Sequence, residues 1–218
     1  MAEMSVTRKA LLGSMLGLLA LPVGAGATME TLPKTAHSAK PSCPGNPCLA
    51  ISRTIGYQAK VGSDRGLMTV PHKGRIVSWT ITLAKPGTKQ IGFFESKLGG
   101  PSEASIVVLR FGKKLRARVV SVAPSKRLKP YFGRTVEFPL AKSIPVEKGN
   151  VIGLSVPTWA PALSVNHGSD TSWRASRKRG SCDDTQTQTA FGPSAIPQFY
   201  CLYRTAQVTY SARVISTP

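Results

Sequence analysis

Proline and glycine interrupt this chain at short intervals from residue 53 onward, and this spacing limits what the chain can fold into. The interruptions include Pro86-Gly87, Gly99-Gly100-Pro101, Pro124, Pro130, Pro139, Pro145, Gly149, Pro157 and Pro161. Proline removes a backbone donor and ends helices, so the stretches between these residues do not favour a long amphipathic helix. Short apolar segments separated by turn residues are typical of antiparallel β-sandwiches and barrels.

The apolar segments show the two-residue period of half-buried strands. In residues 77–83 apolar side chains alternate with Ser and Thr, which predicts a strand with Trp79 in the core. Residues 104–111 and 115–122 flank Gly112-Lys113-Lys114 and predict a hairpin. Further strands are predicted at residues 90–95, 133–140, 151–156 and 205–215. We therefore predict an all-β fold: one antiparallel, jelly-roll-like β-sandwich domain of about eight to ten strands over residues 53–218.

One segment supports the jelly-roll prediction more directly. Residues 143–154 read SIPVEKGNVIGL, which resembles a turn and strand found in many jelly-roll domains. Lys148-Gly149-Asn150 would form the turn, and Ile152 and Leu154 would face the core. Together with the strand of Trp79 and the closing strand at 205–214, the chain is similar to secreted β-sandwich proteins of unknown activity from high-GC Gram-positive bacteria. That resemblance brings no functional residues with it.

The N-terminus has the pattern of a secretory signal. Arg8 and Lys9 precede an uncharged run over residues 10–21, and Ala25-Gly26-Ala27 provides small residues for cleavage. We expect residues 1–27 to be a signal peptide, with an uncleaved anchor as the alternative, and no membrane span in the mature chain. The protein would then be extracellular or associated with the cell envelope. Residues 28–52 show little apolar periodicity and are expected to be a flexible lead-in.

The cysteines are even in number, as is usual for disulfide-bonded exported proteins. They are Cys43, Cys48, Cys182 and Cys201, which allow three pairings. Turn residues lie between the first two, and this favours the pairs Cys43–Cys48 and Cys182–Cys201. Zinc binding is the alternative, but the wide gap between the second two cysteines forms no zinc knuckle.

The chain is strongly basic, with 29 Lys and Arg against 10 Asp and Glu and a net charge of +19. Cleavage of the predicted signal would remove two bases and one acid and leave +18. Such an excess attracts anionic partners without naming them. The positive charge is concentrated in two segments. Residues 104–136 contain nine bases and no acid, and residues 173–179 contain four more bases. If folding joins the two segments, they would form an anion-binding face.

Three aromatic residues are candidates for stacking at that face. Tyr131 and Trp173 lie within or beside the basic segments, and Trp159 lies between two prolines where an exposed ring would stack on a sugar. A ring folded back over the edge of the sandwich is the alternative for Trp159. The candidate ligand-binding residues are Arg110, Arg116, Arg118, Lys126, Arg127, Lys129, Tyr131, Trp159, Trp173, Arg174, Arg177, Lys178 and Arg179.

Residues for catalysis are few. Ser169, His167 and Asp170 lie too close along one segment to form a hydrolase triad in the usual geometry. The scattered carboxylates show no pairing of the kind that glycosidases need. Asp183-Asp184 would suit a calcium ion only with added loop carbonyls, and a solvated loop is the preferred interpretation. We therefore expect a protein without catalytic residues, cofactor or metal.

Three classes of function follow from these observations. The preferred hypothesis is a secreted, non-catalytic module that binds an anionic or sugar-containing polymer of the cell wall or the extracellular space. The alternatives are a structural or adhesive envelope protein without a discrete ligand and, less favoured, a hydrolase on a β-sandwich. Bases interleaved with aromatic rings also suit single-stranded nucleic acid, but the secretory signal argues against nucleic acid as the native partner.

Overall fold

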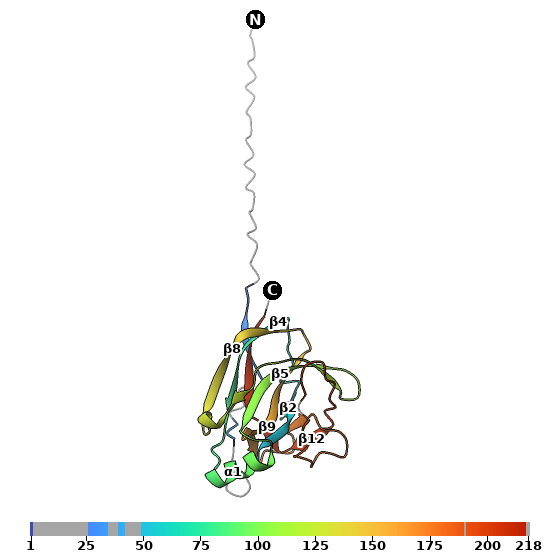
Figure 1. Ribbon diagram of the computed structural model, residues 1–218. Coiled ribbons are helices and arrows are strands. Elements are labelled where there is room, and N and C mark those ends of the chain that lie inside the picture. Colours follow the sequence, from blue (N-terminus) through green and yellow to red (C-terminus); the bar gives the residue numbers. More distant parts are fainter. Residues whose placement is uncertain (2–25, 35–38, 42–48, 190, 217–218) are drawn as a thin grey trace.

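The computed structural model describes residues 1, 26–34, 39–41, 49–189 and 191–216. Two antiparallel sheets pack face to face, and a short helix lies at one end of them (Figure 1). This is the all-β, antiparallel sandwich that the sequence predicts. Within the described ranges, no helix is long and apolar enough to cross a membrane.

The smaller sheet has the strand order β1-β14-β4-β8. Its strands are β1 (Met29–Leu32), β14 (Tyr210–Ser216), β4 (Gly74–Thr82) and β8 (Thr135–Val146). The larger sheet has the order β12-β11-β2-β9-β5-β6, and its pairs are antiparallel. Its strands are β12 (Cys201–Arg204), β11 (Ser172–Ala175), β2 (Ile51–Val61), β9 (Val151–Ala160), β5 (Glu103–Phe111) and β6 (Ala117–Val122).

Four shorter strands complete the described β-structure. They are β3 (Asp64–Arg65), which pairs with β2, β7 (Lys126–Arg127), which pairs with β5, and the separate pair β10 (Leu163–Val165) and β13 (Ala206–Val208). One 3₁₀ turn, η1 (Lys129–Tyr131), follows β7. The strand predicted at residues 205–215 is wrong in part, because the structure divides it into β13 and β14, which belong to different sheets. The sequence pattern does not indicate β3, β7 and β10, because two or three residues are too few to show a period of two.

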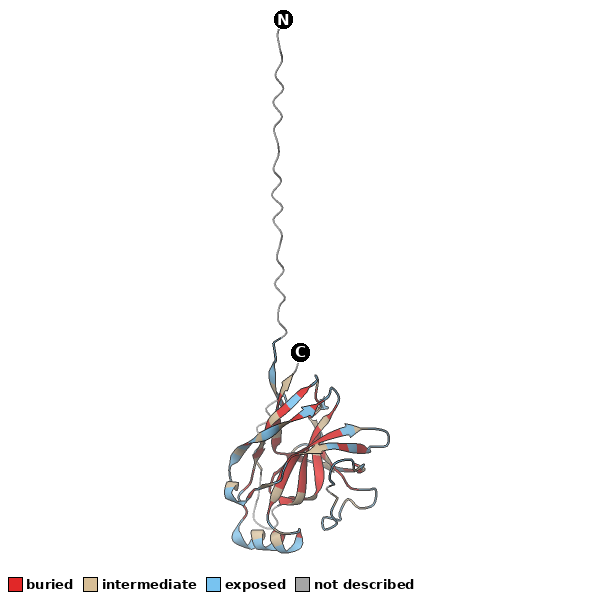
Figure 2. Ribbon diagram, turned by 45° about the horizontal axis from the view of Figure 1, so that its top comes forward, coloured by how far each residue is buried: buried red, intermediate tan, exposed pale blue. Residues whose placement is uncertain are grey.

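The main core lies between the two sheets and contains Trp79, as predicted. Its indole is fully buried and packs against Phe138 with 4.8 Å between ring centres. A bulge in the β4–β8 pairing, between Ile76 and Ser78, shifts the alternation of β4. Ile76 therefore enters the core, and Val77 is only half-buried. Figure 2 shows the buried residues running along the strands, between the packed layers.

Strand β5 is buried on both faces over most of its length. Ile106 and Val108 belong to the core between the sheets, whereas Val107 and Leu109 belong to a second cluster on the outer face of the larger sheet. This explains why the sequence of β5 is a continuous apolar run, because a strand covered on both sides has no polar face. The predicted hairpin of β5 and β6 is confirmed.

The turn before β9 also forms as predicted. Gly149 has a φ of 85°, a conformation that glycine adopts without steric cost. The side-chain oxygen of Asn150 accepts a hydrogen bond of 2.9 Å from the backbone N–H of Glu147, which closes the turn. Ile152 and Leu154 follow it and are fully buried in the core between the sheets.

The strand predicted at residues 90–95 is wrong, because these residues form part of helix α1 (Thr88–Lys97). Ile91, Phe94 and Leu98 recur at helical spacing and face a third apolar cluster, whereas Phe93 is 59% exposed. Two glycines with positive φ, Gly99 and Gly100, follow Leu98 at the end of the helix. The N–H of Gly100 donates to the carbonyl oxygen of Glu95 at 3.0 Å, a usual way to end a helix.

The flexible lead-in predicted at residues 28–52 is wrong in part. Met29–Leu32 forms β1 and pairs with β14, and Leu32 is buried in the core. Strand β2 also begins at Ile51, two residues before the predicted start of the domain. Most of the predicted signal peptide and the predicted Cys43–Cys48 bond lie outside the described residues.

Candidate anion-binding site

A long loop of residues 176–200, the 176–200 loop, joins β11 to β12 and is fastened to β2. Ser176 exchanges two hydrogen bonds with Ile55: its N–H donates to the carbonyl oxygen and its Oγ accepts from the N–H, each at 2.9 Å. Farther along, the N–H of Thr189 donates to the carbonyl oxygen of Arg53 at 2.7 Å. The predicted Cys182–Cys201 disulfide is confirmed and ties the loop to the first residue of β12.

The second arm of this loop lies along the outer edge of β6. The N–H of Val119 donates to the carbonyl oxygen of Ala195 at 2.9 Å, and the N–H of Phe199 donates to that of Leu115 at 2.8 Å. Phe199 is fully buried in the outer cluster with Leu109. The loop therefore covers both the outer face of the larger sheet and its β6 edge.

A cavity of about 520 Å³ lies between the two arms of the loop. One part of its wall is apolar: Phe191, Ala195, Ile196 and Pro197. The other part is polar or basic and includes Arg116, Arg177, Lys178, Ser181, Gln188 and Gln198. Arg116 comes from the first basic segment and Lys178 from the second, so folding brings the two segments together at this cavity.

Arg177 is not the surface cation that the sequence predicts. It is 2% exposed, and its guanidinium donates to the carbonyl oxygen of Ser52 at 2.8 Å and to that of Asp184. Among the described residues, no carboxylate oxygen lies within 4.0 Å of it. Burial of a charge is costly unless it is paired. Arg177 therefore holds the loop in place with its donors, and in the described part of the chain the charge of the nearby Asp184 acts on it without forming an ion pair within 4.0 Å.

Asp184 is the acidic residue among those that line the cavity, and its carboxylate is hydrogen-bonded within its own turn. The carboxylate accepts hydrogen bonds from the hydroxyl and N–H of Thr187 and from the N–H of Gln186. These bonds, those from Thr187 foremost, hold the pKa of Asp184 below its usual value. In the described part of the chain, no three His, Cys, Asp or Glu residues are grouped to hold a metal ion.

Beside the cavity, the β5–β6 hairpin presents unpaired cations. Arg110 and Arg118 are direct cross-strand partners and both are exposed. Arg116 follows on the same face by alternation, and Lys113 and Lys114 lie in the connecting turn. Within the ranges that the structure describes, none of the five has an acidic side chain within 4.0 Å. We call these five residues and Lys178 the basic face.

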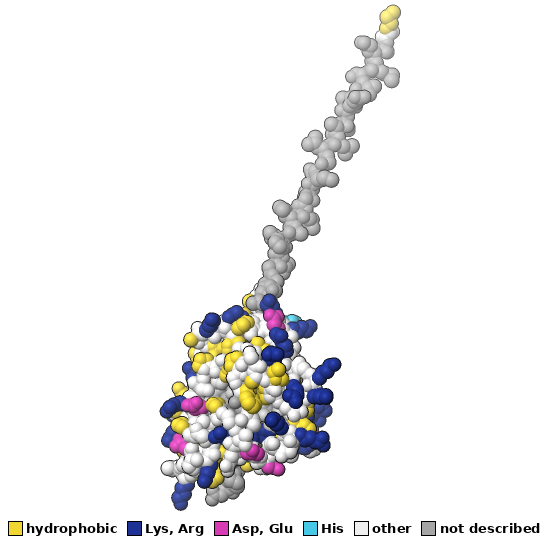
Figure 3. Space-filling model, turned by 45° about the vertical axis from the view of Figure 1, so that its right-hand side comes forward, with side chains coloured by type: hydrophobic (Ala, Val, Ile, Leu, Met, Phe, Trp, Pro, Cys, Tyr) yellow, Lys and Arg dark blue, Asp and Glu magenta, His cyan; other side chains and the backbone are white. Residues whose placement is uncertain are grey.

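Figure 3 shows many Lys and Arg side chains along one side of the molecule, with few acidic side chains among them. The predicted alternation of Arg116 and Arg118 with buried residues is also present, because Ala117 and Val119 lie in the outer cluster. Leu115 departs from the pattern, since its side chain is among the exposed apolar ones.

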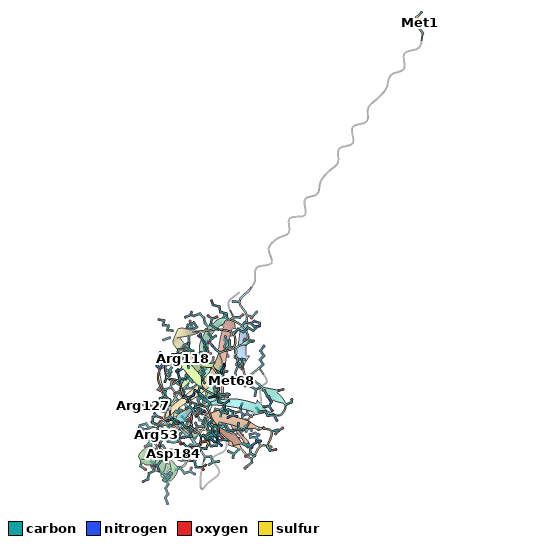
Figure 4. All side chains as sticks on the ribbon, turned by 90° about the vertical axis from the view of Figure 1, so that its right-hand side faces the viewer. Met1, Arg53, Met68, Arg118, Arg127 and Asp184 are labelled. Carbon is teal, nitrogen blue, oxygen red and sulfur yellow. A yellow bond between two sulfur atoms is a disulfide. The ribbon has the colours of Figure 1, made fainter. Side chains whose placement is uncertain are left out.

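The other candidate bases of the first segment lie at the opposite end of β5 and have partners. Arg127 pairs with Glu103 at 3.7 Å and Lys129 with Glu95 at 3.5 Å. Glu103 and Arg110 are seven residues apart on one strand, roughly 23 Å at the usual rise. In Figure 4 Arg127 lies nearer than Arg118 to the end of the molecule that carries α1.

Lys126 and Tyr131, also at this end, contact a single ring. The ammonium of Lys126 lies 6.0 Å from the centre of the Phe138 ring, and Tyr131 meets that ring edge-on at 5.3 Å. Tyr131 is half-buried against the main core, so the structure does not present it as a free stacking surface.

The prediction that Trp159 is an exposed loop residue is wrong. It lies in β9, is fully buried, and packs against Phe94 of α1 with 4.8 Å between ring centres. Its indole N–H donates to the carbonyl oxygen of Gly100 at 3.1 Å. The sequence pattern misleads here because β9 continues through Pro157, which is unusual for a central strand.

Trp173 is likewise buried and cannot act as an open stacking surface. It lies in β11 and stacks on Tyr203 with 4.6 Å between ring centres. Burial raises the pKa of Tyr203, and the nearby charge of Arg177 opposes that rise. Arg174 donates to the carbonyl oxygens of Phe199 and Tyr200, so it too supports the loop. Arg179 is exposed and lies 5.7 Å from the centre of the Tyr200 ring.

The histidine of the predicted polar segment has a partner that the sequence does not suggest. His167 Nε2 and Ser164 Oγ are 2.8 Å apart. Among the residues the structure places, no carboxylate hydrogen-bonds to the other ring nitrogen, and neither His167 nor Ser164 lines the cavity described above.

Comparisons with protein-family models, with curated proteins and with solved structures gave no match. The resemblance to secreted sandwich proteins therefore stays a prediction.

Proposed function

We propose that this protein is a non-catalytic module that binds an anionic extracellular or cell-wall polymer with its basic face. The observation that supports this most is the cross-strand pair of Arg110 and Arg118. Two like charges placed directly opposite each other on a sheet destabilise the fold. A polymer with closely spaced negative charges would neutralise both cations and offset that cost.

The surroundings of this pair favour a polymer over a single small ion. Five cations of the basic face belong to the β5–β6 hairpin and its turn, and the sixth, Lys178, lines the cavity together with Arg116. Each of its six cations is solvent-exposed. An exposed array of this kind binds through many weak contacts and attracts its partner from a distance.

Export of the chain belongs to the same proposal. The Cys182–Cys201 bond is typical of a protein that matures in an oxidising compartment. If the signal is cleaved as the sequence predicts, N-terminal sequencing of the secreted protein will begin at Thr28. A protein retained in the cytoplasm with Met1 intact would contradict export.

The test of polymer binding uses immobilised polygalacturonate, with neutral dextran as the control matrix. We expect the protein to be retained on polygalacturonate at low salt, to elute at high salt, and to pass through dextran. The double variant Arg110→Gln/Arg118→Gln should elute at clearly lower salt.

The matched control removes two cations from the other end of β5, Arg127→Gln/Lys129→Gln, and should elute like the unmodified protein. No retention of the unmodified protein at low salt would overturn the proposal. Equal losses in the two double variants would show that total charge, rather than the basic face, governs retention.

A further inference from the structure

The cavity between the arms of the 176–200 loop has the size and the walls of a small-molecule site. Its volume of about 520 Å³ lies within the usual range for ligand pockets. Such pockets combine an apolar wall with a few polar groups that fix orientation. Here the apolar wall comes from residues 191–197, and the polar groups come from β6 and from the start of the loop.

The charges around the cavity favour an anion. Arg116, Arg177 and Lys178 line it, against the single acid Asp184, whose carboxylate is engaged in its own turn. Arg177 also lines a second cavity, of about 330 Å³. It is a buried guanidinium held by carbonyl oxygens, and an anion placed in the larger cavity would supply the counter-charge that these carbonyls only partly provide.

The apolar wall of the cavity indicates that the anion also carries an apolar group. Phe191 is 43% exposed and Ile196 is 48% exposed, although both are large apolar side chains that line the cavity. A ligand that covers them removes apolar surface from water, which is favourable. An inorganic anion would leave the apolar side chains of this wall exposed to water. A neutral apolar molecule would leave the cations of the cavity without a counter-charge.

From these two walls we infer that the cavity binds a small amphiphilic organic anion, such as an aromatic carboxylate. The carboxylate lies toward Arg116, Arg177 and Lys178, and the ring lies against Phe191 and Ile196. The cavity shares Arg116 and Lys178 with the basic face, but the inference does not depend on polymer binding, because Arg110 and Arg118 do not line the cavity.

The test titrates 1-naphthoate against the intact protein by calorimetry, with binding mapped by amide chemical shifts. Naphthalene-1-methanol has the same ring without the charge, and inorganic phosphate has charge without the ring. We expect 1-naphthoate to bind more tightly than either and to shift the amides of residues 191–198. No binding of 1-naphthoate, or equal binding of the neutral alcohol, would overturn the inference.

A pair of phenylalanine variants separates the cavity from general surface stacking. Phe191→Ala should weaken 1-naphthoate binding about fivefold, because one ring contact is lost. Phe93→Ala removes an exposed phenyl ring on α1, away from the cavity, and should leave the affinity unchanged. Equal weakening by both variants would contradict the site.

A final experiment distinguishes this site from the polymer contact. Phe191→Ala should bind polygalacturonate as the unmodified protein does, since it removes no charge. The double variant Arg110→Gln/Arg118→Gln should bind 1-naphthoate as the unmodified protein does, since neither arginine lines the cavity. Loss of 1-naphthoate binding in that double variant would assign the ligand to the basic face and overturn the inference, while failure of the protein to bind polygalacturonate would leave the 1-naphthoate result intact.

Discussion

The two ends of strand β5 both contain cations but use them differently. At the Glu103 end, Arg127 and Lys129 each pair with a carboxylate. At the Arg110 end, Arg110 faces Arg118 across the hairpin, and among the residues that the structure describes neither has an acidic side chain within 4.0 Å. A segment rich in Lys and Arg therefore does not by itself form a binding surface. What distinguishes the two ends is whether each cation already has a partner within the fold.

The largest expected effect lies at the Glu103 end. Trp159→Ala removes a fully buried indole that packs against α1 and should lower the free energy of unfolding by about 3–5 kcal/mol. Polymer affinity of the folded variant should not change, because the ring faces no ligand. Denaturant unfolding and retention on polygalacturonate measure the two quantities. A small loss of stability together with weaker binding would show that the indole contacts the ligand.

Next in size is the loss of the Cys182–Cys201 bond at the loop. Cys182→Ser/Cys201→Ser should lower the free energy of unfolding by about 3 kcal/mol, as expected for a closed loop of this length. The 1-naphthoate site should weaken as well, because the bond holds one arm of its wall. Unchanged stability, measured by denaturant unfolding under oxidising conditions, would contradict a structural role for the bond.

Reversing the charge of one arginine should change the free energy of unfolding in opposite directions at the two ends of β5. Arg118→Glu places a carboxylate opposite Arg110 and should raise the free energy of unfolding by roughly 0.2–1 kcal/mol while it weakens polymer binding. Arg127→Glu places a second carboxylate opposite Glu103 and should lower stability. Both changes alter net charge equally, so thermal unfolding of the pair isolates the local contact. The same sign of change in both variants would contradict the comparison.

The smallest expected effect is the response of the Asp184 turn to acid. Hydrogen bonds from Thr187 hold the pKa of Asp184 below its usual value, so the turn is fully stabilised above pH 3.8. This contribution is lost as the pH falls through the lower pKa of the folded state. The amide shifts of Gln186 and Thr187 should titrate with a midpoint below 3.8. A midpoint above that value would show that the turn does not hold the carboxylate.

Sequence patterns predicted the parts of the fold that repeat locally. The β5–β6 hairpin, the turn at Gly149 and the core position of Trp79 each follow from alternation or turn residues within a dozen positions. Helix α1 was missed because its short apolar run fits a strand as well as a helix. Its spacing of Ile91, Phe94 and Leu98 was the signal that distinguishes the two.

The candidate site was harder to predict because its parts come from distant segments. The alternation of Arg116 and Arg118 was visible, but the pairing of residues 194–199 with the edge of β6 was not. Phe191 and Ile196 lie in a stretch without periodicity, so no local pattern marks them as a cavity wall. Arg177 looked like its exposed neighbours, since only the fold shows that its donors meet carbonyl oxygens.

The central claim is that the unpaired cations at the Arg110 end hold a polyanion, and the salt dependence of binding tests it most directly. The slope of log affinity against log salt concentration reports how many cations contact the polymer, at roughly 0.7 unit for each contact with a single-stranded polyanion. For polygalacturonate, Arg110→Gln/Arg118→Gln should reduce the slope by about 1.4 units. Arg127→Gln/Lys129→Gln should leave it unchanged, and equal slopes for the two variants would contradict the account.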